Sequence, residues 1–181
     1  MPVARGSLLV GPGDGEPYNR SAAFVSRLAP HSMSMRIQVH DVVSYAGRDY
    51  VIEGIVSYGT GAESWQLARA VDGEAVLWIE PPHAETGERL LVLREIRDLE
   101  MSVPPPAAIA YHDLTYVQRL ATRATIGLEG RVPERSSGSL MLWRYRAAGD
   151  LYLQLEEGAG RVAMLAGETV HHGMIEVLPG R

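Results

Sequence analysis

Residues 40–80 constrain the fold more than any other part of the chain, because they read as short strands separated by glycine turns. Polar and apolar side chains alternate over residues 49–58, as expected of a β-strand with two different faces. Asp72-Gly73 stands between two apolar stretches, residues 64–71 and 74–80. A dipeptide of this kind in such a place is a strong signal for a β-hairpin. The region therefore predicts an all-β fold.

The chain continues after this region with the same rhythm of short strands and turns. We expect further strands at residues 36–40, 42–45, 89–96, 109–116, 117–130, 140–146, 151–157, 161–165 and 174–178. The stretch 117–126 also fits a short helix, so both structures stay open there. About ten to twelve short, closely spaced strands are typical of barrels and sandwiches.

Three adjoining prolines, Pro104 to Pro106, indicate a boundary, because such a run fits neither a helix interior nor a central strand. We therefore expect a poorly structured or short-helical N-terminal tail (1–34), a first β unit (35–102), a proline spacer (103–107) and a second β unit (108–181). Residues 64–80 and 151–167 share an aromatic residue, a strand, a glycine turn and a second strand. Two small, related antiparallel units, each barrel- or sandwich-like and packed together, are the predicted architecture.

Composition excludes several kinds of chemistry. The chain has no cysteine, and all 17 of its basic residues are arginine. Thiolate metal sites, Schiff bases and the lysine of phosphate-binding loops are therefore absent. The net charge of -5 disfavours nucleic acid as a partner. No apolar stretch approaches the ~20 residues of a transmembrane helix, so a cytoplasmic protein is expected, and peripheral membrane association stays open.

A family resemblance accompanies these patterns. The residues that carry it are Val42-Val43, Gly47, Tyr50-Val51, Gly54, Trp65, Gly73 and residues 77–80, then Gly130, Trp143, Tyr145, residues 149–151, Gly167 and residues 175–180. Over roughly residues 36–180 the chain resembles an uncharacterised bacterial family, domain of unknown function 4178. The family has no established activity. Its members are small cytosolic β-rich proteins that tend to be encoded near membrane-stress proteins and polyamine-synthesis-like enzymes, which implies an accessory or interaction role.

Aromatic and acidic residues supply the candidate binding site. In the strands, the candidates for contact with a ligand or partner are Trp65, Trp78, Trp143, Tyr145, Glu53 and Glu80. Aromatic faces and carboxylates together attract cationic groups. Carboxylates for acid–base chemistry could come from Glu53, Glu63, Glu80, Glu156 or Glu157, provided that two of them converge in a desolvated place. No catalytic residue is assigned.

Histidines supply only weak metal candidates. His112-Asp113 and His171-His172 are the pairs considered. Adjacent residues of a strand point to opposite faces, so His171 and His172 share a metal only if they lie in a turn. No metal and no cofactor is therefore expected.

These observations favour a non-enzymatic binding or scaffolding module that acts with a protein partner, in a membrane-stress-related bacterial system. The alternative is a small-molecule-binding or enzymatic β-barrel with a carboxylate and aromatic pocket, for example for a cationic ligand. A closed pocket with convergent carboxylates would favour the alternative, whereas a flat aromatic patch or a free strand edge would favour the partner. The oligomeric state stays open.

Overall fold

The computed structural model describes residues 35–61, 63–83 and 86–180, and these residues form an all-β structure. The strands are β1 (Val42–Tyr45), β2 (Arg48–Gly59), β3 (Ser64–Asp72), β4 (Ala75–Glu80), β5 (Arg89–Glu95), β6 (Ala108–Tyr111), β7 (Leu114–Gly130), β8 (Gly138–Ala147), β9 (Leu151–Gly158), β10 (Arg161–His171) and β11 (Ile175–Leu178). A 3-10 turn, η1 (His172–Met174), precedes β11. The expectations for the tail, residues 1–34, lie outside the described residues. No helix in the described part of the chain is long and apolar enough to span a bilayer.

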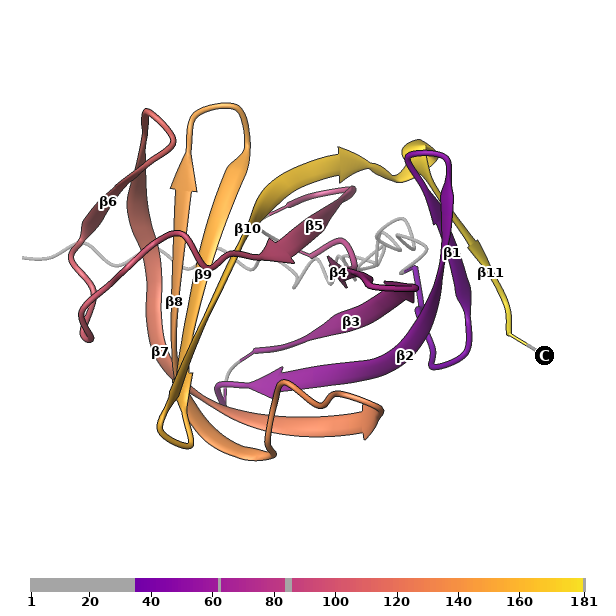
Figure 1. Ribbon diagram of the computed structural model, residues 1–181, viewed down its shortest axis with the longest axis horizontal. Helices are drawn as coiled ribbons and strands as arrows, with labels where there is room; N and C mark the ends of the chain where they lie inside the picture. Colours follow the sequence, from indigo (N-terminus) through magenta and orange to yellow (C-terminus); the bar gives the residue numbers. More distant parts are fainter. Residues whose placement is uncertain (1–34, 62, 84–85, 181) are drawn as a thin grey trace, which may run out of the picture. The chain divides into compact units, whose positions relative to one another are not determined.

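Eight strands close a single antiparallel barrel in the order β2-β3-β4-β5-β10-β9-β8-β7. The closing seam pairs residues 54–59 of β2 with residues 125–130 of β7, and in Figure 1 the end of β7 runs beneath β2. The N-terminal part of β2 continues past the barrel and pairs with β1, which pairs with β11. The start of β7 pairs with β6 in the same way. These three strands are additions to the barrel wall.

The two predicted β units are not separate barrels or sandwiches. β2–β5 form one half of the wall and β7–β10 the other, joined at the seam and between β5 and β10. A four-stranded sheet has two open edges, and closure pairs each edge with the other half. The expected spacer also packs on the barrel wall. Val103 contacts an apolar cluster on the outside of the second half, which we call the outer cluster and whose buried members are Ile109, Tyr116, Trp143, Tyr145, Leu153 and Leu155. The Tyr145 hydroxyl donates a hydrogen bond to the Pro106 carbonyl oxygen (2.9 Å).

The two halves nevertheless share one strand plan. In the first half Val43 of β1 faces Tyr50 of β2, and in the second Ile109 of β6 faces Tyr116 of β7. All four side chains are buried. Each pair belongs to a hairpin that covers the outside of its own half of the barrel. Each half of the barrel wall therefore carries one covering hairpin.

The β-bulges show which hairpins correspond. In β2 a β-bulge shifts the register directly before the residue that pairs with Arg69 of β3. In β7 a β-bulge shifts the register directly before the residue that pairs with Arg144 of β8. This matches β3–β4 with β8–β9. The sequence pattern instead matches residues 64–80 with residues 151–167, which form β9 and β10. That correspondence is wrong. Alternation and a glycine turn occur in any two hairpins, whereas each β-bulge lies at one particular place in the strand pairing and so identifies the corresponding strands.

The strand expected at residues 36–40 is absent, because residues 35–38 have no regular secondary structure and residues 39–40 form a turn. The structure also changes one strand boundary and decides between the two structures left open for residues 117–126. His112 and Asp113 form a turn with positive φ values of 47° and 59°, so residues 109–116 are two strands rather than one. Residues 117–126 are part of β7, which excludes the short helix. Along this stretch exposed residues alternate with half-buried or buried ones, as a barrel wall requires.

We predict that Gly130→Ala destabilises the protein by about 2–4 kcal/mol, because Gly130 is required at the seam. Its φ is +68°, and a Cβ there would lie 2.4 Å from the carbonyl oxygen of Glu53. Urea unfolding, followed by tryptophan fluorescence, measures the change in the free energy of unfolding.

Gly127→Ala is the matched control in the same seam. A Cβ on Gly127 would meet no atom within 4 Å, so this variant should stay within about 1 kcal/mol of the wild type. Equal losses in the two variants would contradict the role assigned to Gly130.

Candidate functional site

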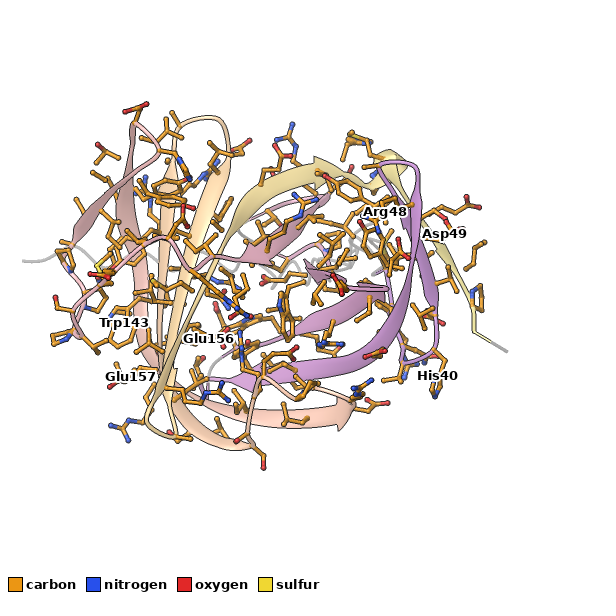
Figure 2. The ribbon with its side chains drawn as sticks, viewed as in Figure 1. His40, Arg48, Asp49, Trp143, Glu156 and Glu157 are labelled. Carbon is orange, nitrogen blue, oxygen red and sulfur yellow. The ribbon has the colours of Figure 1, made fainter. Side chains whose placement is uncertain are left out.

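The barrel interior brings together three of the predicted site residues. Trp78 and Glu80 are fully buried, and Trp65 packs against the same apolar cluster at the start of β3. Trp143 and Tyr145 lie on the other side of the wall, in the outer cluster of the second half. Figure 2 shows Trp143 and Glu156 on opposite sides of the barrel wall. The tryptophans and tyrosines therefore do not form one exposed aromatic patch.

Glu80, the last residue of β4, is held from two sides. Its Oε2 accepts a hydrogen bond from Nη2 of Arg144, which projects inward from β8. Its Oε1 lies 2.5 Å from Nε2 of His83, whose side chain is 22% exposed. A buried carboxylate needs such partners, because desolvation of an unpaired charge is costly.

Hydrogen bonds continue from Arg144 across the barrel. Arg144 Nε donates to Oε1 of Gln154 (2.9 Å), and Gln154 Nε2 donates to Oε1 of Glu156 (2.7 Å). Glu156 also accepts from the Tyr58 hydroxyl (2.7 Å) and from Nε of Arg135 (2.6 Å). We call this group the interior network. Hydrogen bonds join Glu80, Arg144, Gln154, Glu156, Tyr58 and Arg135, and His83 belongs to it through its close contact with Glu80.

Aromatic rings enclose the cations of the interior network. The Arg144 guanidinium lies over the Trp65 ring (5.2 Å), and the Arg135 guanidinium lies over the Trp78 ring (5.0 Å). Trp65 stacks on Tyr58 with ring centroids 5.2 Å apart. Burial, followed by the charge of Glu156, raises the pKa of Tyr58 well above its ordinary value, so this phenol stays a hydrogen-bond donor.

Glu53 lies in a separate ion cluster. Nη1 of Arg69 donates to Glu53 (2.7 Å), while Nε and Nη2 of Arg69 hold both oxygens of Glu134 (2.9 and 2.7 Å). Burial alone would raise the pKa of Glu134, but the hydrogen bonds and charge of Arg69 outweigh it, and the pKa is lowered. Glu53 and Glu80 therefore do not converge, and each is paired with an arginine.

A groove opens beside Trp65 and His83, with a volume of about 460 Å³. This size falls within the range of ligand pockets. Its described walls are formed by Met35, Arg36, Ser57, Ser64, Trp65, Gln66, Pro81, Pro82 and His83. We call it the mouth groove. Through His83 it touches the interior network directly.

The metal candidates do not converge. His112 Nε2 lies 3.4 Å from Asp98, and Asp113 is the other residue of the β6–β7 turn. The ring centroids of His171 and His172 lie 4.3 Å apart at the end of β10. Among the described residues, no group of three or more possible ligands is placed to hold a metal ion.

Sequence reasoning missed the role of the buried arginines. Arg144 lies on the same inward face of β8 as Leu142, and Gln154 lies on the same inward face of β9 as Glu156. A polar residue in phase with buried apolar neighbours is the signal that could have identified them. Arg135 had no such signal, because it comes from the loop between β7 and β8.

We predict that Glu156→Gln costs about 3–5 kcal/mol, because it leaves the buried charge of Arg135 unpaired. The side chains of Arg135 and Glu156 are 6% and 2% exposed. The free energy of unfolding in urea measures the loss. Adding Arg135→Gln to this variant should restore part of the stability, because the unpaired charge is removed.

The exposed pair Arg48–Asp72, with side chains 52% and 38% exposed, provides the control. Asp72→Asn should cost less than about 1 kcal/mol. A loss in Glu156→Gln no larger than this one would show that the interior network contributes little to stability.

We predict that acid removes the contribution of Glu134. A carboxyl whose pKa is lowered on folding stabilises the protein above its unfolded pKa, and the contribution is lost as the pH falls through the folded pKa. The difference in unfolding free energy between wild type and Glu134→Gln should therefore be present at pH 7 and shrink below the ordinary value of 4.5. Urea unfolding over a pH series measures it.

Glu129→Gln is the control for that series, since Glu129 is exposed at the end of β7. It should differ little from the wild type at every pH. A Glu134→Gln difference that does not change on acidification would contradict the assignment.

Comparison with known proteins yields one match. Residues 38–172 match the family described as Domain of unknown function (DUF4178). Neither the curated proteins nor the solved structures contain a significant match to the chain.

Proposed function

The chain belongs to the DUF4178 family, and from this premise and the geometry of the mouth groove we propose that it is a non-enzymatic binding module whose groove holds an acidic segment of a protein partner. The proposed location is the cytoplasm. The membrane-stress setting implied by the family resemblance is where the partner is best sought.

The proposal rests on the ionisable residues that line the mouth groove. Arg36 and His83 are the ionisable residues of its described walls, and neither is a carboxylate. Arg36 is exposed, so a negative group can reach it from solvent. The remaining described walls combine the Trp65 ring and two prolines with the polar side chains of Ser57, Ser64 and Gln66. Such a surface suits a short peptide with one acidic and one apolar side chain.

The alternative of a cationic ligand finds less support. It requires Glu53 and Glu80 to face one pocket, but Arg69 pairs with the first and Arg144 with the second. Their negative charges are therefore already compensated inside the protein. A cation entering the mouth groove would also meet the positive charge of Arg36.

The experiment is an affinity capture with the tagged chain from its native host, followed by mass spectrometry. We predict that wild type recovers a stoichiometric protein partner and that Arg36→Glu loses it. An acidic segment of that partner, made as a peptide, should bind Arg36→Glu about tenfold more weakly than wild type. Higher salt should weaken binding to the wild type.

Arg97→Glu is the matched control, because Arg97 is 88% exposed and does not line the groove. It should keep the partner. Equal capture by wild type and Arg36→Glu would overturn the groove as the binding surface. Recovery of the wild-type chain alone would overturn the protein partner and bring the small-molecule alternative forward.

A further inference from the structure

A second, smaller cavity lies where the loop between β7 and β8 meets the turn between β9 and β10. Its volume is about 60 Å³. By this measure a single water needs about 10–15 Å³, so the cavity has room for a group of several heavy atoms. Its walls include Arg135, Ser136, Ser137, Ser139, Arg161 and Glu156.

This cavity corresponds to the mouth groove in the other half of the barrel. By strand register, Ser139 and Leu140 take the places of Ser64 and Trp65, and Glu156 takes the place of Glu80. The loop between β7 and β8 is longer than the one between β2 and β3 and delivers Arg135 into the barrel. The result is a narrow cavity in place of an open groove.

Arg135 provides a buried donor without an acceptor. Its side chain is 6% exposed, its Nε donates to Glu156 and its Nη1 donates to the Glu134 carbonyl oxygen (3.4 Å). Its Nη2 is buried and has no hydrogen-bond partner among the described residues. A buried charged donor without an acceptor is costly. An acceptor group beside Arg135 would remove that cost.

The charges around the cavity favour a negative acceptor. Glu134 is already held by Arg69, and Glu156 is already held by Arg135, Tyr58 and Gln154. Arg161 adds a positive charge that has no ion pair among the described residues. The two carboxylates are thus compensated and the Arg161 charge is not.

We propose that this cavity binds a small tetrahedral oxyanion of the phosphate type. Arginine is well suited to phosphate because its guanidinium presents several donors in one plane. Arg135 supplies the buried donor, Arg161 supplies charge at the rim, and the hydroxyls of Ser136, Ser137 and Ser139 supply neutral donors. The proposal does not rest on the mouth groove or on a protein partner.

Inorganic phosphate is the probe, added to the full chain with chloride at matched ionic strength as the reference. We expect phosphate to raise the melting temperature more than chloride does, because binding to the folded state stabilises it. Titration calorimetry should give a 1:1 stoichiometry. Arg161→Gln and Ser137→Ala should each weaken the phosphate Kd by about tenfold.

Arg119→Gln is the control, since Arg119 is exposed on β7 and does not line the cavity. It should bind phosphate as the wild type does. Arg135 is left intact in all variants because it also pairs with Glu156. The absence of a phosphate-specific shift in the wild type would overturn the proposal, as would equal binding by wild type, Arg161→Gln and Ser137→Ala.

Discussion

The pairing of β2 with β7 is the constraint on which the remaining structure depends. The pairing of β5 with β10 already joins the two halves into one sheet, and the pairing of β2 with β7 closes the eight strands of that sheet into a barrel with a buried interior. Without it, Glu80 and Glu156 would lie on an open sheet face, where water would solvate them. Inside the closed barrel they need internal partners, and Arg144 and Arg135 provide them. The interior network is thus a consequence of closure.

The barrel also has two unequal openings, and the lengths of the loops beside them explain the difference. The shared strand plan places Glu80 and Glu156 at corresponding positions, each beside an opening between strands and loops. A short connection leaves the first opening as a groove beside Trp65. A longer loop narrows the second to a cavity by inserting Arg135. One architecture thus offers two surfaces that differ in size and in the ligands proposed for them.

Much of the fold could be predicted because local patterns specify it. Alternation and glycine turns located most of the strands, including the hairpin at Asp72-Gly73. The candidate site was predicted only in part: Trp65, Trp78 and Glu80 do meet, but Glu53 and Trp143 lie elsewhere. A strand's alternation says that two faces differ, and it does not say which other strands share a face.

The amino-acid sequence by itself determined the all-β class, most strand positions, the absence of thiol and lysine chemistry and the resemblance to the family. Each of these follows from residue type or from short-range periodicity. Only the tertiary structure decided that the two halves form one barrel, that Arg135 reaches Glu156 and that Arg144 reaches Glu80. These pairings join residues from different strands and loops, and the closed arrangement of the strands determines which charges meet.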